Sequence, residues 1–582
     1  MSQVNCSSDY SRVLEEVIRL INIEMYSVQG VGSRERIVAT ALREGAANLY
    51  SYDGKSLVKL NREPVSGVAR VPYGASRVVF TRDVARGREQ HLLYTVSLDS
   101  PGEEERVEGV EPSRIMGVVY DDERIVYVSA TMGEIAIYSV DGKPRKVATL
   151  SGFATLTDLS GNTAVGVGAL DPASGRFQGL VVDLASGEVK VYKPENASAT
   201  YMVIHPEGWI IAGVEGPSGA WLEKVDPNTM ESRRLELPHG DLEEFEPMSF
   251  NYVGFLPDGA LVVVGRKNGR SRIFLDGKQV DAPTGIHGGV YKWRGRLVTT
   301  YTSLKTPPSI VGLDGSKVLA GEVPDFVEEA ISTVGFELVE SYDGSKVPTF
   351  FVESSRAGRP GPTITLVHGG PFAETADIWD VFAASLALAG FNVVMPNYRG
   401  STGYGEEWRL RIIGDPCGGE LEDIVAASKW ALESGLASNL YIMGYSYGGY
   451  MTMCALTRKP GFYKAGVAGA SVVDWKEMYE LSDAAFKSFI AMLFAGKMDL
   501  LGERSPISYV DSLRDPLMIV HPQNDSRTPL KPVLRFMEKA LEKGKSFEAY
   551  IAPDMGHAVN KVEDVYKILY PALAFLLRNR SP

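Results

Sequence analysis

One serine in the last third of the chain has the sequence context of a catalytic nucleophile. Ser446 is the central residue of GYSYG at residues 444–448. Apolar residues before this pentapeptide predict a strand, and those after it predict a helix. A serine on the sharp turn between them projects above a sheet, and the flanking glycines permit that strained backbone. We therefore expect Ser446 to attack a carbonyl carbon; an ordinary turn residue is the weaker interpretation.

The base that activates this serine can be found by elimination. The chain has seven histidines, and in the α/β-hydrolase fold the histidine follows both the nucleophile and the acid. Only His521 and His557 come after Ser446. His521 lies within the apolar strand PLMIVHP and leaves no strand end for an acid before it, which favours a structural role. We expect His557, in the loop PDMGH after a predicted strand, to be the base.

The acid should end the strand that precedes the histidine loop. Asp525 closes PLMIVHPQND, 32 residues before His557, which leaves room for one helix and one strand. An aspartate there orients the imidazole and stabilises its protonated form in the transition state. Asp554 is the competing acid, but it lies only three residues before His557, where a turn former is expected.

Two backbone N–H groups must stabilise the oxyanion that forms during acyl transfer. In this fold one belongs to the residue after the nucleophile, here Tyr447, and the other to the loop after an early strand. That loop is HGGP at residues 368–371, whose glycines let the backbone approach a substrate closely. We assign the second donor to Gly370.

Four further side chains near the predicted sheet edge are candidates for substrate binding. Trp475, Phe486 and Phe489 follow the strand KAGVAGASVV, on the carboxyl side of the sheet where ligands bind. They predict either an apolar pocket for a substrate side chain or the core of a helix. Arg527 either binds a substrate carbonyl or carboxylate or pairs with a neighbouring acid. Both alternatives stay open.

The elements that would position these residues alternate between strands and helices. In residues 326–582, near-continuous apolar strands such as TITLV and NLYIM are separated by amphipathic helices. Strands that are buried on both faces require this pattern, which indicates a mostly parallel sheet covered by helices. We therefore predict an α/β-hydrolase catalytic domain over this range.

The first half of the chain has a different pattern of predicted elements. Residues 26–325 read as short alternating strands, with an Asp- or Ser-rich turn every 38 to 50 residues, about 43 on average. This is the period of one four-stranded blade, and seven turns predict a seven-bladed β-propeller. A pair of β-sandwiches with chance spacing is the alternative. The turn residues are Asp53, Asp99, Asp141, Ser186, Asp226, Asp276 and Asp314.

A short segment precedes this repeat. Residues 10–25 carry a helical apolar stripe that includes Val13, Val17, Leu20 and Ile21. We expect this N-terminal helix to pack on the catalytic domain, so that two chain crossings join the two domains.

Composition narrows the set of partners. A formal net charge of −13 leaves no basic surplus for nucleic acid or for an anionic membrane surface. No apolar run is long enough to span a bilayer, the first residues do not resemble a secretory signal, and no motif requires a metal or another cofactor. We expect a cytoplasmic location. The sequence leaves the oligomeric state open, with a homodimer as one option.

Two compositional features bear on stability. Only six glutamines occur, and a low content of thermolabile amides is a tendency of thermophilic proteins. Of the three cysteines, Cys417 and Cys454 lie in the predicted catalytic domain. They would be free thiols in an ordinary cytosol but could form a disulfide in a hyperthermophile. A disulfide would leave Cys6 as the remaining thiol.

Several stretches together resemble one family. HGGP at 368–371, NYRGSTGYG at 397–405, GYSYGGY at 444–450 and the predicted propeller are similar to the prolyl oligopeptidase family of serine peptidases. Within it, the chain most resembles the archaeal acylaminoacyl peptidases. The resemblance implies release of N-acyl amino acids from short blocked peptides, with accompanying esterase activity. It also assigns the triad and the oxyanion donors to the residues named above.

Other functions stay open. Dipeptidyl peptidases of this family bind a free N-terminus with paired glutamates, and Glu243-Glu244 lies in the predicted propeller, although a solvated acidic turn is the simpler interpretation. An oligopeptidase of the same family is a further alternative. The last is a non-catalytic propeller scaffold, against which the complete triad argues. In the enzymatic cases a closed disc over the active site would admit only small, flexible peptides.

Overall fold

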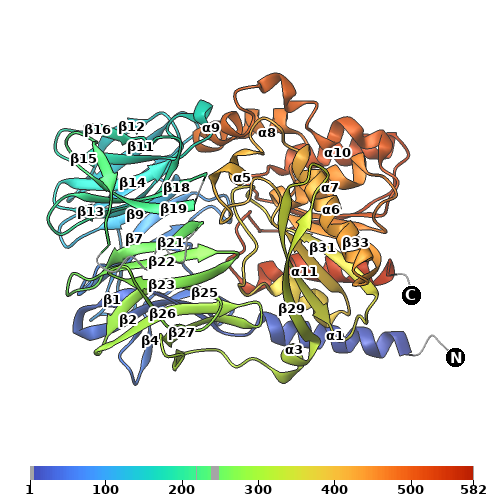
Figure 1. The fold of residues 1–582 in the computed structure, drawn as a ribbon, viewed down its shortest axis with the longest axis horizontal. Helices are drawn as coiled ribbons and strands as arrows, with labels where there is room; N and C mark the ends of the chain where they lie inside the picture. Colours follow the sequence, from blue (N-terminus) through green and yellow to red (C-terminus); the bar gives the residue numbers. More distant parts are fainter. Residues whose placement is uncertain (1–4, 218, 238–247, 581–582) are drawn as a thin grey trace.

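Two kinds of sheet divide the chain. The computed structural model describes residues 5–217, 219–237 and 248–580. Seven four-stranded antiparallel sheets come first, and one eight-stranded, mostly parallel sheet follows. Figure 1 shows the four-stranded sheets gathered on one side of the molecule, with the second half of the chain lying against them. The predicted fold class, a β-propeller with an α/β-hydrolase domain, is confirmed.

Each blade of the propeller contains four consecutive strands. Blades one to four comprise β1 Met25–Gly32, β2 Arg36–Arg43, β3 Ala46–Tyr52, β4 Leu57–Lys59, β5 Gly67–Val68, β6 Arg77–Asp83, β7 His91–Ser97, β8 Glu104–Arg106, β9 Arg114–Tyr120, β10 Ile125–Ala130, β11 Ile135–Val140, β12 Pro144–Leu150, β13 Ala154–Ser160, β14 Thr163–Gly168, β15 Gln178–Asp183 and β16 Val189–Tyr192. Blades five to seven comprise β17 Ser198–Ile204, β18 Ile210–Gly216, β19 Gly219–Val225, β20 Ser232–Arg234, β21 Ser249–Phe255, β22 Leu261–Lys267, β23 Arg270–Leu275, β24 Lys278–Val280, β25 Ile286–Trp293, β26 Arg296–Ser303, β27 Thr306–Gly312 and β28 Lys317–Leu319.

The turn that repeats in the sequence has one place in every blade. It joins the third strand to the fourth, from β3–β4 in the first blade to β27–β28 in the last. In the first blade, Asp53 Oδ1 accepts the backbone N–H groups of Lys55 and Ser56 at 2.8 and 2.7 Å. The aspartate thus replaces backbone partners within the turn, which is why this residue type marks the period.

Apolar packing closes the ring of blades. Tyr26 and Val28 of the first blade share a core cluster with Trp293 and Ile310 of the last. Because every blade is built from consecutive strands, burial between neighbouring blades rather than strand exchange holds the disc together.

The second half contains the sheet that carries the predicted catalytic residues. Its order is β29-β30-β32-β31-β33-β34-β35-β36, and the pairs from β32 onward are parallel. The strands are β29 Ile331–Glu340, β30 Lys346–Ser354, β31 Gly361–Val367, β32 Asn392–Pro396, β33 Ala437–Tyr445, β34 Gly466–Gly469, β35 Leu517–Pro522 and β36 Glu548–Ala552.

Helices cover both faces of this sheet. They are α3 Asp325–Ala330, α4 Val381–Leu388, α5 Glu406–Leu410, α6 Gly419–Glu433, α7 Tyr447–Arg458, α8 Trp475–Leu481, α9 Ala484–Leu493, α10 Leu530–Glu542 and α11 Val562–Arg578. The sheet therefore has two cores: α6, α7 and α10 contribute to one, and α4 and α11 to the other. Alternate residues of β33 serve the two cores, with Ile442 in the first and Met443 in the second.

The N-terminal helix ends earlier than predicted. A helix over residues 10–25 was expected, but α1 spans Asn5–Ile21 and β1 begins at Met25. The Asn22 side chain donates to Ile18 O at 2.8 Å and so binds a carbonyl of the last turn. The chain then enters the first blade, whose strand pairing takes precedence over the helical pattern.

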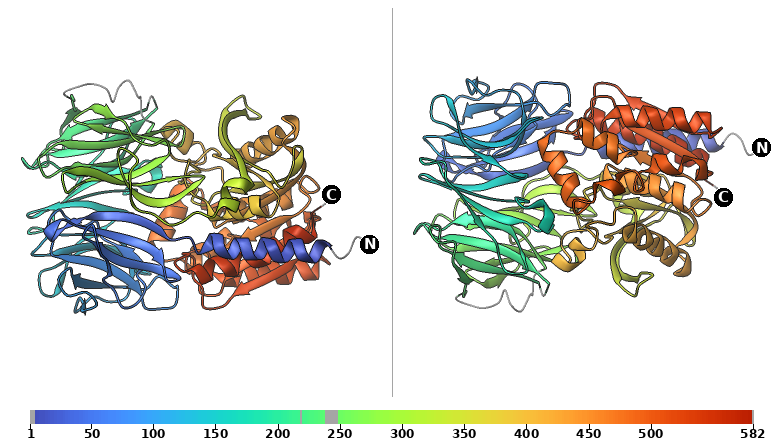
Figure 2. Two further views of the ribbon diagram at one scale, coloured as in Figure 1. Left: turned by 90° about the horizontal axis from the view of Figure 1, so that it is seen from below. Right: turned by 90° about the horizontal axis from the view of Figure 1, so that it is seen from above.

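The apolar face of α1 packs on the α/β half. Val17, Leu20 and Ile21 are buried in the core cluster to which α4 and α11 contribute. Arg356, just after β30, donates to Glu16 at 3.1 Å. Figure 2 shows α1 lying along the second half, so the chain passes between the two halves twice.

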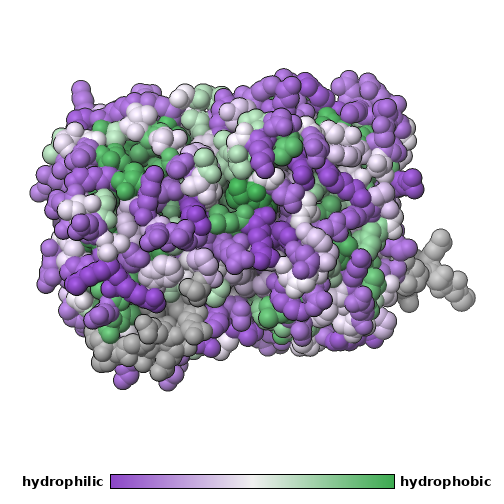
Figure 3. Space-filling model, turned by 45° about the horizontal axis from the view of Figure 1, so that its top comes forward, coloured by the Kyte–Doolittle hydropathy of each residue, from purple (hydrophilic) through white to green (hydrophobic). Residues whose placement is uncertain are grey.

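The face of the molecule seen in Figure 3 is mainly hydrophilic. In Figure 3 apolar side chains gather at the seam between the two halves on the face that is seen. Among the described helices, none is both long and apolar enough to cross a bilayer.

Candidate active site

The predicted nucleophile sits on a strained turn. Ser446 is the single residue between β33 and α7, and its φ and ψ are 59° and −122°. Its N–H donates to Gly469 O at 2.9 Å. A Cβ at Gly444 would collide with the backbone of Gly448, and one at Gly448 would collide with Val367 O. Both glycines are therefore required for this turn to pack against the sheet.

The three residues predicted as a triad form one hydrogen-bonded chain. His557 Nε2 lies 2.9 Å from Ser446 Oγ, and His557 Nδ1 lies 2.7 Å from Asp525 Oδ2. The Asp525 side chain is fully buried and that of His557 is 7% exposed. The loops after β33, β35 and β36 supply one residue each, so the triad lies at one edge of the parallel sheet. Tyr445 OH donates to His557 O at 3.0 Å and fixes the histidine loop.

Asp525 is held in its ionised form. Its carboxylate accepts the N–H groups of Arg527 at 2.9 Å and Thr528 at 2.8 Å, and the Thr528 hydroxyl at 2.8 Å. Burial alone would raise the pKa of Asp525, but the charge and hydrogen bond of His557 and the backbone donors hold it below its ordinary value. A buried carboxylate with these contacts can orient the imidazole and balance its positive charge.

The predicted oxyanion loop lies against the nucleophile. A Cβ at Gly369 would be 3.3 Å from Ser446 Cβ, and the following Gly370 has a φ of +119°, which favours glycine. On the other side, Tyr447 is the first residue of α7, so its N–H has no acceptor within the helix. Tyr447 thus follows Ser446 directly, and the loop that carries Gly370 lies against the nucleophile through Gly369.

The competing histidine and acid lie elsewhere. His521 is buried, and its Nε2 is 2.8 Å from Thr528 O. Asp554 faces solvent and lies 3.5 Å from Arg86 of the propeller. Neither residue contacts Ser446 in a way that would replace His557 or Asp525.

A disulfide supports the helix that starts at the nucleophile. Cys454 of α7 is bonded to Cys417, which precedes α6, and both side chains are buried. Of the two alternatives that the sequence left for these cysteines, the structure contains the disulfide.

The three aromatic candidates separate into two groups. Trp475 is only 1% exposed, and its ring packs 5.2 Å from that of Tyr450 and 5.4 Å from that of Phe494. It lies in the core of the α/β half, as the helix-core interpretation expects. Phe486 and Phe489 are only partly buried and pack at the edge of the same core.

Phe486 and Phe489 begin a row of rings that crosses the seam. Phe489 lies 6.1 Å from Phe372 of the oxyanion loop, and Phe372 lies 6.2 Å from Phe177 of the propeller. Arg114 stacks over Phe486 at 4.9 Å. A cavity of about 430 Å³, lined in part by Phe177, adjoins this row. The site therefore has an apolar wall to which both halves contribute.

Arg527 pairs with an acid of the propeller. Its Nε lies 2.9 Å from Oε2 of Glu89, and its Nη2 lies 2.5 Å from Oε1. Burial alone would raise the pKa of Glu89, yet the guanidinium groups of Arg527 and Arg114 lower it to about 2. Of the two alternatives for Arg527, the structure therefore contains the ion pair.

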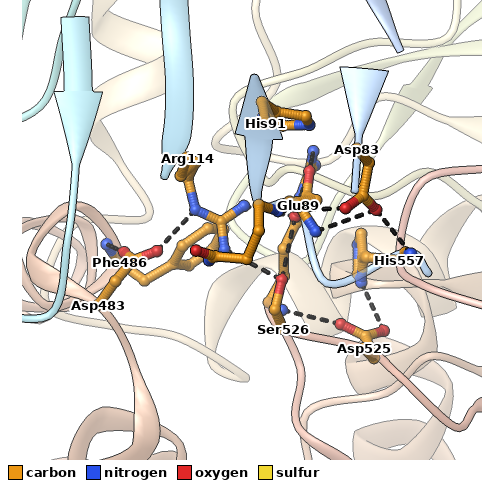
Figure 4. A network of polar contacts seen from close by, with 12 residues as sticks. Asp83, Glu89, His91, Arg114, Asp483, Phe486, Asp525, Ser526 and His557 are labelled. Carbon is orange, nitrogen blue, oxygen red and sulfur yellow. Dashed lines mark hydrogen bonds and ion pairs between the residues drawn. The ribbon is translucent and has the colours of Figure 1, made fainter. Parts of the chain in front are cut away.

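This pair belongs to a wider polar network, which Figure 4 shows beside Asp525 and His557. Arg114, the first residue of β9, donates to Glu89, to Asp483 Oδ2 at 2.6 Å and to Ser526 Oγ at 3.2 Å. Ser526 follows the catalytic aspartate directly, and Asp483 precedes α9. We call Glu89, Arg114, Asp483 and Arg527 the seam cluster; the two halves contribute two residues each.

One propeller loop also touches both catalytic loops. Residues 84–90 connect β6 to β7, and Arg86 O accepts the Asn524 side chain at 2.9 Å. Gly87 packs so closely on Gly556, next to His557, that neither glycine has room for a Cβ. The histidine loop is thus in direct backbone contact with the propeller.

No sequence motif marks Glu89, Arg114 or Asp483 as part of this network. Each is an ordinary charged residue near the end of a predicted element, and no spacing marks which hairpin of a repeat reaches the other half. The Glu243-Glu244 pair considered for a free N-terminus lies outside the described residues. Within the described chain, no group of three or more His, Cys, Asp or Glu side chains is arranged to hold a metal ion.

The comparison with family models follows the two halves of the chain. Residues 380–581 match the model of the prolyl oligopeptidase family. Over these residues the chain is similar to members of this family. Residues 38–311 match a model described as the N-terminal domain of acylamino-acid-releasing enzyme-like proteins. The two matches cover most of the propeller and most of the catalytic half, but not residues 326–379.

Curated proteins are similar to about a third of the chain. Dipeptidyl aminopeptidase BIII of Pseudoxanthomonas mexicana is 30% identical over 220 residues, which cover 36% of this chain and 32% of that protein. The human acylamino-acid-releasing enzyme is 28% identical over 213 residues, which cover 35% of this chain and 29% of that enzyme. The match thus spans about a third of each relative.

Solved structures of two peptidases have the same fold over nearly the whole chain. A puromycin-hydrolyzing peptidase of Mycobacterium tuberculosis superimposes with a TM-score of 0.80 at 18% identity, covering 97% of this chain and 96% of that one. The acylaminoacyl peptidase of Pyrococcus horikoshii gives 0.70 at 17% identity, covering 96% of each. At this identity the likeness concerns the fold.

Proposed function

We propose that the chain is a serine exopeptidase that releases N-acyl amino acids from short blocked peptides. The observation that carries the proposal is the hydrogen-bonded chain from Ser446 through His557 to Asp525, with distances of 2.9 and 2.7 Å. It lies at the seam, where the propeller limits access. The matching family models and the names of the relatives support the same activity.

The reaction proceeds through a covalent acyl-enzyme. Ser446 Oγ attacks the carbonyl carbon of the scissile amide while His557 Nε2 takes the hydroxyl proton. The negative charge forms on the carbonyl oxygen, where the N–H groups of Tyr447 and Gly370 stabilise it. When the C–N bond breaks, His557 returns the proton to the departing amine. Water then attacks the acyl-Ser446 ester by the same steps and releases the N-acyl amino acid.

The charge distribution at the seam supports a blocked rather than a free N-terminus. A site that binds the ammonium group of a free N-terminus needs a carboxylate that is not already paired with a cation of the protein. Glu89, the acid of the seam cluster that lies beside the triad, is paired with both Arg527 and Arg114. The aromatic row from Phe486 to Phe177 offers an apolar surface to an uncharged acyl group instead. We assign substrate contact to Phe486 and Phe489, with Trp475 supporting them from the core.

Ester hydrolysis is part of the same proposal. An ester of an N-acyl amino acid forms the same acyl-enzyme, and its alkoxide departs more easily than an amine. The buried disulfide is compatible with a cytoplasmic location in a thermophile, the setting in which intracellular disulfides are an accepted exception. A thermal unfolding midpoint below about 65 °C, within the mesophilic range, would contradict the thermophilic origin.

The deciding experiment compares matched short peptides with an acetylated or a free amino terminus. We expect the acetylated peptides to have the higher kcat/KM and to yield the N-acetyl amino acid as first product. A preference for free amines, with release of dipeptides, would favour a dipeptidyl peptidase, and internal cleavage of both would favour an oligopeptidase. Absence of labelling of Ser446 by a fluorophosphonate probe would favour a non-catalytic scaffold.

A further inference from the structure

A cleft opens at the seam beside the loops that carry Asp525 and His557. Its volume is about 850 Å³. The propeller contributes the β6–β7 loop and the β10–β11 hairpin, and the catalytic half contributes residues 523–531. Met132 and Leu481, both exposed, give it apolar walls. The cleft is large enough for several residues of an extended peptide.

In the proposed reaction this cleft would receive the part of the peptide that carries the leaving amine. In the proposed reaction His557 protonates that amine, so the peptide that leaves must lie beside the histidine loop. Asn524, which lines the cleft, donates its N–H to Met555 O at 2.8 Å, two residues before His557. Gln523 also lines it, and its N–H donates to Ala552 O at 2.9 Å. The wall of the cleft is therefore joined by backbone hydrogen bonds to the segment that leads to His557.

The charges that line the cleft leave one cation without an acid. Arg114 is paired with Asp483 at 2.6 Å, and Lys531 lies 3.5 Å from Glu477. Arg88 lines the same cleft from the β6–β7 loop. Within the part of the chain that the structure describes, no carboxylate lies within ion-pair distance of Arg88. In a protein with a net charge of −13, an unpaired guanidinium in a cleft is suited to an anionic group of the substrate.

We propose that this cleft binds the departing part of the peptide and that Arg88 binds its C-terminal carboxylate. The inference rests on the proposed peptidase function and adds the substrate class: short N-acylated peptides with a free carboxyl terminus. Guanidinium and carboxylate match in geometry and charge, and the exposed Arg88 side chain is accessible to a peptide in the cleft. Arg88 would then determine specificity without touching the reacting atoms.

The test uses N-acetylated tripeptides and tetrapeptides that end either in a carboxylate or in an amide. At low ionic strength the intact enzyme should cleave the carboxylate form with a kcat/KM about fivefold higher, the upper range for a partly exposed ion pair. Arg88→Gln should bring that ratio close to one. The ratio of the intact enzyme should also shrink as salt is raised, because salt screens such a pair.

Arg86→Gln is the matched control. Arg86 lies in the same loop and carries the same charge, but its side chain is 81% exposed and faces Asp554 rather than the cleft. This variant should have the same carboxylate-to-amide ratio of kcat/KM as the intact enzyme. An N-acetyl amino acid p-nitroanilide, whose leaving group has no carboxylate, reports whether each variant is folded and active.

Three results would overturn the inference while leaving the peptidase function intact. They are a carboxylate-to-amide ratio below twofold in the intact enzyme, an unchanged ratio in Arg88→Gln, and an equal loss of the ratio in Arg86→Gln. If the intact enzyme hydrolyses neither the p-nitroanilide nor the acetylated peptides, the proposed function fails, and this inference fails with it.

Discussion

Two buried ionic arrangements lie next to each other at the centre of the molecule. The triad is built from one half only, and its acid serves a single histidine at 2.7 Å. The seam cluster is built from both halves and balances two guanidinium groups against two carboxylates. Ser526 belongs to the loop of the catalytic acid and contacts Arg114 at 3.2 Å, so the two arrangements share a segment.

The comparison suggests different roles: the triad carries out the chemistry, and the seam cluster controls access of substrate to the active site. A triad confined to one half keeps its geometry whatever the propeller does, except where the propeller presses on the histidine loop. A cluster shared by both halves exists only when the halves are together, so its free energy contributes to closure over the site. Changes in the triad should therefore reduce turnover, and changes in the cluster should alter stability and the size of substrate admitted.

The largest effect is expected from Ser446→Ala. Without the nucleophile, kcat/KM should fall by a factor of about 10⁴ or more, and labelling by a fluorophosphonate probe should disappear. Thermal stability should stay near that of the intact protein, because the change removes one hydroxyl. Steady-state kinetics and a melting curve on the same preparation provide the check. Activity above a few per cent would show that chemistry does not depend on this serine.

Arg114→Met should mainly affect the seam. It leaves Asp483 without its partner at 2.6 Å, and breaking a buried pair costs about 3–5 kcal/mol in free energy of unfolding. Hydrolysis of small esters should change far less than in Ser446→Ala. Cleavage of a blocked peptide of about 40 residues should increase relative to a short one, because opening of the halves controls access.

The control for this change is Arg124→Met in the same half. Arg124 pairs with the exposed Glu123 at 3.5 Å, so its loss should cost less than about 1 kcal/mol. Equal unfolding curves for the two variants would mean that the seam cluster does not stabilise the closed form. If the intact enzyme already digests long and short peptides equally, the propeller does not select by size.

The disulfide offers a comparison within the catalytic half. The double variant Cys417→Ser and Cys454→Ser should lower the free energy of unfolding by about 3–4 kcal/mol, since the bond closes a loop over a separation of 37 residues. Selection by size should stay unchanged, because neither residue lies at the seam. Thiol titration of the denatured, unreduced protein should detect Cys6 alone. Three reactive thiols would contradict the bond.

Several parts of this arrangement could be predicted from the sequence for physical reasons. A serine between two glycines, after a strand and before a helix, satisfies a strict local requirement, and the fold fixes the order of acid and histidine. The Asp-rich turns mark blades because the aspartate itself bonds the turn. The nucleophile turn and the Asp-rich turns each depend on a few neighbouring residues, so they can be recognised in a single sequence.

The remaining parts depend on contacts between distant segments. Nothing near Glu89 or Arg114 shows that their hairpins meet residues of the other half more than 300 positions later. The sequence alone therefore does not distinguish substrate binding by Arg527 from an ion pair, or an apolar pocket at Trp475 from a place in the core. The end of α1 was misplaced because strand pairing with β2 overrides a helical pattern that continues through Met25.

The smallest effect concerns a further ion pair across the seam, outside the seam cluster. Glu374, four residues after Gly370, lies 2.7 Å from Arg266 of β22, and its side chain is 6% exposed. Burial raises the pKa of Glu374 to about 7, which outweighs the opposite influence of Arg266. The unfolded chain gives up this proton near the ordinary value of 4.5, so the folded protein binds more protons between these two pH values.

Stability that depends on this group is thus complete below about pH 4.5 and is lost as pH rises through about 7. Glu374→Gln removes the titration, so between pH 5 and 8 its free energy of unfolding should fall less than that of the intact protein, by up to about 3 kcal/mol. Glu407→Gln, at an exposed site of the same half, should keep the original slope. Parallel denaturation curves for the intact protein and Glu374→Gln across this range would mean that Glu374 is already ionised at pH 5. The Arg266 pair would then act as an ordinary salt bridge, and closure of the seam would not respond to pH through this residue.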